Sequence, residues 1–367
     1  MNYYNPVKIL FDKPYAEEIE KISDLKKKRM IFCYNGFEKS ELFDSLSDKN
    51  GDDLVYSESE ENPSVQSIDK VLRLAMDFKP EIVLAIGGGS VIDTAKVVRY
   101  GLYLNQSSVN KIIQGEVAGI SINKPLLIAV PTTHGTGSEV TMWATVWDKV
   151  KNKKYSISDS DNYPEYAIYD HRLFETLPLA VSVSSTLDAL SHSFEALWNK
   201  NGNPVSDHFA FESIKLIEKN MDMLTDTIPV KARKELILAS MYAGLSFSNT
   251  KTAAAHSISY PLTLRYGIPH GIACSMPLFP LLKINRKGIE DKLVKLFMNC
   301  RSRNIEEFEQ RIKEAVAGKV LFSLSEFGVN EDELDGLVGE SFTKERMANN
   351  IIELNSRDVR SILGEIY

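Results

Sequence analysis

The sequence has few cysteines and no pattern that would pair them. Only three occur in 367 residues, at Cys33, Cys274 and Cys300, and no two form a Cys-x-x-Cys motif. An odd number of isolated cysteines is typical of proteins that stay reduced. We therefore expect a cytoplasmic protein without a disulfide framework.

Long apolar runs and a basic surface are also missing. No apolar stretch is long enough to cross a bilayer, and the N-terminal Met-Asn-Tyr-Tyr-Asn-Pro lacks the basic and apolar regions of a signal peptide. Lysine and arginine number 43 against 50 acidic residues, which gives a net charge of −7. We therefore expect neither a membrane span nor a nucleic-acid partner.

The first half of the chain alternates between strand and helix patterns. A length of 367 residues suggests two domains, and 43% hydrophobic with 25% charged residues is typical of a globular protein. Apolar runs predict strands, some of them buried on both faces, and apolar residues at helical spacing predict a helix over 63–78. This order predicts a Rossmann-like α/β domain with a parallel sheet. The expected strands are 29–34, 53–57, 80–86 and 125–130.

The second half is dominated by helical periodicity. We place the domain boundary at Pro178, with a dinucleotide-binding α/β domain over 1–178 and an all-helical domain over 179–367. Asn355 is expected to cap the last helix. The other helices expected here are 212–223, 232–247, 289–297 and 305–322.

A glycine-rich loop, Gly87-Gly88-Gly89-Ser90, follows a predicted buried strand and opens a helix. Glycines permit positive φ and close approach of a ligand, and a helix N-terminus favours phosphate. The spacing is not the Gly-x-Gly-x-x-Gly of ordinary dinucleotide folds. We favour a pyrophosphate site over the alternative of a tight turn without a ligand.

A second polar loop runs from Pro131 to Glu139 and also follows a buried strand. Its hydroxyls and glycines would lie at a strand's carboxyl end, where open α/β sheets bind ligands. By itself it is equally compatible with an exposed turn. Together with the glycine loop it favours a shared cofactor.

Four polar residues of the helical half have the composition of a metal site: Asp188, His192, His256 and His270. Asp188 and His192 are four residues apart in a helical stretch and share one face. His256 falls in a second helical stretch, and His270 in a turn. One carboxylate and three imidazoles suit Fe²⁺ or Zn²⁺, and also accept Mn²⁺ or Ni²⁺.

The alternative to a metal is four separate structural residues. Burying these side chains without a partner would cost roughly several kcal/mol in total, so a shared ion is the simpler account. Cys274 follows His270 by four residues and is a possible soft ligand. We assign it to the pocket wall or core because the four other residues already fill a tetrahedral set.

These motifs together resemble the iron-containing (group III) alcohol dehydrogenase family over nearly the whole chain. The resemblance implies hydride exchange between NAD(P)H and a small aldehyde or alcohol on a divalent metal, with the active site between two domains of a homodimer. The matching segments are Gly87-Gly-Gly-Ser-Val-Ile-Asp-Thr-Ala-Lys96, Pro131-Thr-Thr-His-Gly-Thr-Gly-Ser-Glu-Val-Thr141, Asp188-Ala-Leu-Ser-His192, His256 and Pro269-His270-Gly271.

The resemblance also implies roles for individual residues. The family's four metal ligands correspond to Asp188, His192, His256 and His270. Cofactor-binding positions fall on Gly87, Gly88, Gly89, Ser90, Asp93, Thr132, Thr133, Thr136, Ser138 and Lys154.

Two departures from the family bear on mechanism and coenzyme. Many members have a histidine four residues after the first late histidine, where this chain has Tyr260, which could donate a proton or line the pocket. NAD-preferring members place an aspartate after the first strand, where this chain has Tyr34-Asn35-Gly36. Without a carboxylate there a 2′-phosphate is not repelled, which favours NADPH.

The substrate is less constrained than the chemistry. The segment around His256 resembles a subgroup that includes phosphonoacetaldehyde reductases, and Lys251 and Arg265 flank it. Either cation could bind an anionic tail, or both could be solvated surface residues. Alternative functions compatible with the sequence are those of a glycerol-dehydrogenase-like enzyme, a dehydroquinate-synthase-like lyase, and a non-catalytic nucleotide or metal sensor.

Overall fold

The computed structural model of the chain describes residues 2–23, 27–46, 53–151 and 153–367. The chain divides into two compact units. An α/β unit comprises Asn5–Thr133 and Ser138–Thr176, and a helical unit comprises Leu177–Tyr367 with the N-terminal residues to Tyr4 and the segment His134–Gly137. The chain thus passes from the α/β unit to the helical unit close to the expected boundary. Within the second polar loop, the short segment His134–Gly137 also belongs to the helical unit.

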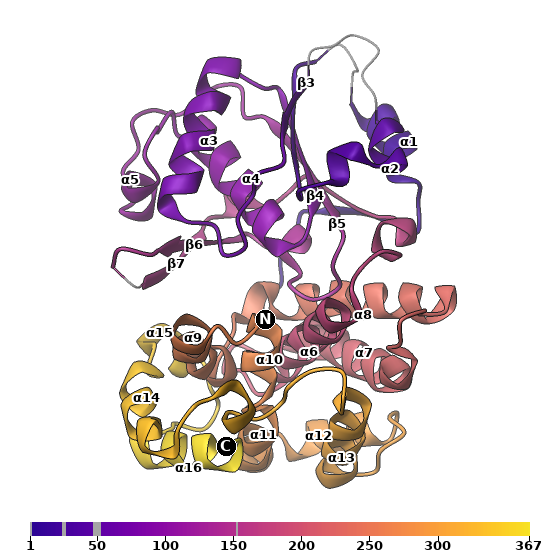
Figure 1. Ribbon diagram of the computed structural model, residues 1–367, viewed down its shortest axis with the longest axis vertical. Helices are drawn as coiled ribbons and strands as arrows, with labels where there is room; N and C mark the ends of the chain where they lie inside the picture. Colours follow the sequence, from indigo (N-terminus) through magenta and orange to yellow (C-terminus); the bar gives the residue numbers. More distant parts are fainter. Residues whose placement is uncertain (1, 24–26, 47–52, 152) are drawn as a thin grey trace. The chain divides into compact units, whose positions relative to one another are not determined.

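A six-stranded parallel sheet has the strand order β1-β8-β5-β4-β2-β3. Figure 1 shows strands β3, β4 and β5 in the α/β unit. Two further strands form an antiparallel hairpin. The strands are β1 Lys8–Phe11, β2 Arg29–Cys33, β3 Asp53–Tyr56, β4 Ile82–Gly87, β5 Leu126–Pro131, β6 Trp143–Asp148, β7 Lys153–Ser158 and β8 Tyr166–Tyr169; the helices are α1 Tyr15–Ile22, α2 Glu41–Asp44, α3 Val65–Phe78, α4 Gly89–Tyr103 and α5 Val109–Ile113.

The predicted parallel sheet is confirmed, and burial explains it. Every residue of β2 and β4 is buried, as expected for strands covered on both faces. Helix α3 begins where Ser64 accepts a hydrogen bond from the amide of Ser67, and its apolar residues at helical spacing enter the core beside α4. The strands that the sequence did not predict are β1, β6, β7 and β8.

The helical unit contains α6 Leu179–Leu197, α7 Pro204–Asn220, α8 Val230–Thr250, α9 Ala254–Tyr266, α10 His270–Ser275, α11 Leu278–Asn285, α12 Glu290–Phe297, α13 Ile305–Val316, α14 Leu334–Glu340, α15 Lys344–Met347 and α16 Ser356–Glu365 (Figure 1). The all-helical prediction is confirmed. Asn355 caps α16, as predicted. Helix α13 is shorter than expected because Gly318 turns the chain with φ of +72°. Within the described part of the chain, no helix combines the length and apolarity needed to span a membrane.

Candidate metal centre

A close approach of α10 to α6 builds the centre. A Cβ added to Gly271 would lie 2.0 Å from the carbonyl oxygen of Ser184 and 3.0 Å from the Asp188 side chain. Only glycine therefore lets α10 pack this tightly. The sequence predicted that His270 lies in a turn, but this residue is the first of α10. Pro269 precedes it as the cap residue.

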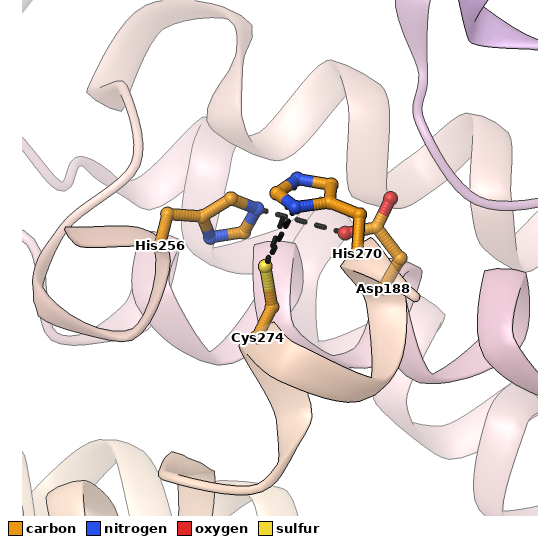
Figure 2. A group of neighbouring side chains, drawn as sticks. All are labelled: Asp188, His256, His270 and Cys274. Atoms are coloured by element: carbon orange, nitrogen blue, oxygen red, sulfur yellow. Dashed lines mark hydrogen bonds and ion pairs between the residues drawn. The ribbon is translucent and has the colours of Figure 1, made fainter. Parts of the chain in front are cut away.

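Four side chains of the helical unit meet at one point (Figure 2). Asp188, His256, His270 and Cys274 each offer one ligand atom, and these atoms all lie within 4.8 Å of one another. Asp188 Oδ1 and His256 Nε2 are 3.6 Å apart. The Cys274 sulfur lies 3.6 Å from His270 Nδ1. These separations are close to those of atoms that share a bound metal ion.

The hydrogen-bond inventory supports an ion at this point. Asp188 and His256 are each only 3% exposed. Neither Asp188 Oδ1 nor His256 Nε2 has a hydrogen-bond partner among the described residues. Leaving a buried carboxylate oxygen and an imidazole nitrogen unpaired is costly. A cation between them satisfies both atoms, so the residues present fit a divalent metal.

The carboxyl group of Asp188 is in the form that binds a metal. Burial opposes its ionisation, but His192, His256 and His270 outweigh that effect and hold the pKa of Asp188 below its ordinary value. An ionised carboxylate at the centre would offset one of the two charges of the ion.

His192 lies at the side of this set. Its Nε2 is 3.9 Å from Asp188 Oδ1, but it is outside the group of four mutually close ligand atoms. Its ring is stacked between Phe247, at 4.1 Å between centroids, and His256, at 4.5 Å. Burial lowers the pKa of His192 to about 4 and keeps the ring neutral, as metal coordination requires.

Cys274 contributes the fourth of these clustered ligand atoms, and its assignment to the pocket wall or core stays a prediction. It follows His270 by four residues, and both belong to α10, so one helical face carries both side chains. Its side chain is fully buried, and its sulfur lies at the cluster.

Glu195 was missed by the sequence reasoning. It is fully buried in α6 and accepts hydrogen bonds from the backbone amide of His256 at 3.1 Å and from its ring Nδ1 at 2.6 Å. A carboxylate bound to Nδ1 fixes the tautomer in which Nε2 is free to bind a metal. The available signal was a charged residue three positions after His192 in an apolar helical stretch.

The glycine loop is built for close packing and not for positive φ. Gly87 ends β4, Gly88 precedes α4 in extended conformation, and none of Gly87 to Gly89 has positive φ. A Cβ on Gly87 would lie 2.6 Å from Val91, and one on Gly88 would lie 3.2 Å from Thr133. The two predicted cofactor loops therefore touch at Gly88 and Thr133, beside the N-terminus of α4.

Asp93 and Ser138 are bound to each other. Ser138 Oγ donates to Asp93 and accepts from the fully buried Lys96, whose ammonium also donates to the carbonyl oxygens of Thr141 and Trp143. Burial lowers the pKa of Lys96 to about 8. These contacts show how Asp93 and Ser138 fix the second loop to α4; direct contact with a cofactor stays a prediction for both.

The segment His134–Gly137 is fixed within the helical unit. His134 is 2% exposed, and its ring nitrogens lie 2.9 Å from Ser182 Oγ and 3.2 Å from Thr186 Oγ1 of α6. A Cβ on Gly135 would lie 2.6 Å from the carbonyl oxygen of Ser185. Thr132 and Thr133 thus belong to the α/β unit, whereas Thr136 belongs to the helical unit.

The remaining predicted residues are placed as follows. Tyr260 is 8% exposed on α9, one turn after His256, and the ammonium of Lys154 lies 5.1 Å from the centre of the Trp147 ring in the β6–β7 hairpin. Lys251 is exposed at the end of α8. Arg265 pairs with Glu340 at 3.2 Å and Glu333 at 3.8 Å, so its charge is already matched at the surface.

Comparison with known proteins agrees with the architecture. A curated relative, 4-hydroxybutyrate dehydrogenase of Clostridium kluyveri, is 29% identical over 96% of both chains. Phosphonoacetaldehyde reductase of Streptomyces viridochromogenes is 32% identical over 60% of this chain and 57% of its own. The solved structure of sulfoacetaldehyde reductase from Bifidobacterium kashiwanohense in complex with NAD⁺ is similar with a TM-score of 0.90 and 27% identity, covering 100% of this chain and 98% of that one.

Two family models together account for most of the sequence. Iron-containing alcohol dehydrogenase matches residues 6–171, and the C-terminal domain of the Fe-containing alcohol dehydrogenase family matches residues 182–367. The buried carboxylate and imidazoles lie in the second of these regions. The chain belongs to the iron-containing alcohol dehydrogenase family.

Proposed function

We propose that this protein reduces a small aldehyde with an anionic tail, using a nicotinamide coenzyme and a divalent metal. The observation that carries the proposal is the convergence of unpaired buried ligand atoms from Asp188 and His256 with His270 at one point. Three similar proteins are named for anionic substrates, namely a 4-hydroxybutyrate, a phosphonoacetaldehyde and a sulfoacetaldehyde enzyme.

The protein's own residues would orient the reactants. Asp188, His192, His256 and His270 would hold the metal, with the Cys274 sulfur beside them, and a bound ion would supply Lewis acidity toward a carbonyl oxygen. A pyrophosphate would bind at the first amides of α4, where Gly88 provides no side-chain cap. Tyr260 is our candidate donor of the proton that the reduced carbonyl oxygen gains, since it follows His256 by one helical turn.

A coenzyme-oxidation screen tests the function. Metal-stripped protein is reloaded separately with Fe²⁺ and Zn²⁺ and mixed with NADH or NADPH and a panel of sulfoacetaldehyde, phosphonoacetaldehyde, succinate semialdehyde and butanal. We expect metal-dependent loss of absorbance at 340 nm, with kcat/KM highest for an anionic aldehyde. If no aldehyde is accompanied by coenzyme oxidation, the non-catalytic alternative is favoured. If butanal is reduced as fast as the anionic aldehydes, the proposed preference for an anionic tail is wrong.

The turn after β2 bears on the choice of coenzyme. Cys33 ends β2 and pairs with Ile86 of β4, directly before the glycine loop. The sequence-based preference for NADPH rested on the lack of a carboxylate in Tyr34-Asn35-Gly36. In the structure a carboxylate does lie at this turn, because Glu38 Oε2 accepts the amide hydrogen of Gly36 at 2.9 Å. A carboxylate at this position suits a ribose hydroxyl and repels a 2′-phosphate, so we propose NADH.

The variant Glu38→Gln should shift coenzyme preference toward NADPH. Two unit charges about 4 Å apart in water interact by about 1 kcal/mol, so we expect the ratio of kcat/KM for NADPH over NADH to rise about fivefold. Steady-state kinetics with both coenzymes measure this ratio. Glu41→Gln, an exposed residue of α2, is the matched control. An unchanged ratio in Glu38→Gln would show that this carboxylate does not face the ribose.

A further inference from the structure

Tyr260 and Arg346 form a pair on the ligand-bearing side of α9. The guanidinium carbon of Arg346 lies 4.7 Å from the centre of the Tyr260 ring. Tyr260 is buried and follows His256 by four residues on α9. Residues at this spacing lie on one helical face with Cβ atoms about 5–6 Å apart. The cation therefore contacts a side chain one helical turn from a candidate metal ligand.

The positive charge of Arg346 lacks an acidic partner among the residues that the structure describes. Its side chain is half-buried on α15, and no described residue forms an ion pair with it. The ring face of Tyr260 attracts a cation but supplies no acceptor for the five N–H groups of a guanidinium. A partly desolvated guanidinium in this state is suited to bind an anion in a two-pronged manner.

Hydrogen bonds fix the segment that carries Arg346 to the ligand-bearing helices. Ser257, the neighbour of His256, donates through Oγ to the carbonyl oxygen of Ser341 at 2.6 Å and accepts from the amide of Thr343 at 2.9 Å. After α15, the amide of Ile351 donates to the carbonyl oxygen of Trp198, at the end of α6, at 3.0 Å. Arg346 is thus held between two anchors, one on the helix of His256 and one on the helix of Asp188.

The other cations near the site are less suited to this role. Arg265, on the same helix as Tyr260, is already paired with Glu340 and Glu333. Lys251 is exposed beyond the end of α8. Neither has the combination of partial burial, an aromatic platform next to His256 and an unmatched charge. The structure therefore favours Arg346 over both residues that the sequence had suggested.

We propose that Arg346 is the specificity-determining residue that binds the anionic tail of the substrate. A sulfonate, phosphonate or carboxylate would accept hydrogen bonds from the guanidinium, while the Tyr260 ring supports the cation from its other side and the aldehyde group reaches the metal centre. This inference rests on the proposed function, since it assigns the group that recognises the tail.

The test compares an anionic and a neutral aldehyde in metal-loaded protein. In Arg346→Met, loss of a charge-assisted hydrogen bond should raise KM for sulfoacetaldehyde by about tenfold or more. Both kcat and the KM for butanal should change less than about twofold, because butanal has no group for the guanidinium to bind. Arg346→Lys should recover part of the lost affinity. Lys344→Met removes an exposed charge from the same helix and should change none of these values.

A binding measurement separates this inference from the proposed function. Calorimetric titration of the metal-loaded protein with ethanesulfonate, which has no aldehyde to reduce, should show about tenfold weaker binding in Arg346→Met than in the unmodified chain. Equal binding would overturn the proposal, as would a similar rise of KM for both aldehydes. If no aldehyde is reduced at all while the difference in ethanesulfonate binding persists, the proposed function fails and the anion site stands.

Discussion

Asp188→Asn should abolish tight metal binding and lower kcat/KM by about a thousandfold or more. Asp188 supplies the carboxylate of the clustered ligand atoms, and its Oδ1 faces the shared point without a hydrogen-bond partner among the described residues. Asparagine keeps the size but removes the charge that offsets the ion. A bound metal supplies several kcal/mol of charge stabilisation in such reactions, and about 1.4 kcal/mol corresponds to a factor of ten. Metal content after gel filtration and steady-state kinetics measure the two effects.

Thermal unfolding distinguishes loss of the ion from loss of the fold. An ion that binds only the folded state raises the melting temperature of the unmodified chain, and this rise should be absent in Asp188→Asn. Without metal, the variant should still unfold cooperatively, at a melting temperature no higher than that of the unmodified chain, because the neighbouring histidines favour the ionised carboxylate by more than its burial costs. Asp335→Asn, which alters an exposed carboxylate on α14, should behave like the unmodified chain. Stoichiometric metal and activity within tenfold in Asp188→Asn would contradict the centre.

The central strands and the helices of the candidate metal centre could be predicted because each has a strong local pattern. Strand β4 is a continuous apolar run, and α6 places Asp188 and His192 four residues apart. Strands β1 and β8 are four residues each and were missed, since they are defined by pairing with each other and, for β8, with β5. The end of α13 was predicted too late because Gly318 adopts a positive φ, which glycine permits but does not require.

The parts of the site that depend on contacts distant in sequence could not be predicted. Glu195 and Cys274 had local signals at helical spacing from His192 and His270, respectively. Arg346 had none, since it reaches Tyr260 through anchors separated from it by many tens of residues in sequence. Glu38 was missed for a different reason. Its contact with the Gly36 amide is local, but it depends on a turn in which Gly36 has a φ of +93°, and no residue pattern in the sequence specifies that conformation.

Glu195→Gln should weaken metal binding by about 10- to 100-fold, the range typical of lost partners behind a metal-binding histidine. The carboxylate of Glu195 accepts the ring hydrogen of His256 at 2.6 Å, which leaves Nε2 as the ligand atom. Glutamine keeps the length of the side chain, but its neutral amide holds the imidazole less strongly and can present a donor to Nδ1. The metal dissociation constant, measured by competition with a chelator, is the relevant quantity.

Excess metal separates a positioning role from a catalytic one. Glu195 contacts His256 and is buried in α6, so we expect kcat of Glu195→Gln at saturating metal to recover most of its value while the dissociation constant stays raised. A purely structural role would instead lower the melting temperature of the metal-free protein and leave metal affinity unchanged. Glu353→Gln, a change at an exposed position of the same unit, controls for the loss of one negative charge. Because Glu195 acts on the ion only through the His256 ring, the double variant Glu195→Gln/His256→Ala should bind metal no more weakly than His256→Ala alone.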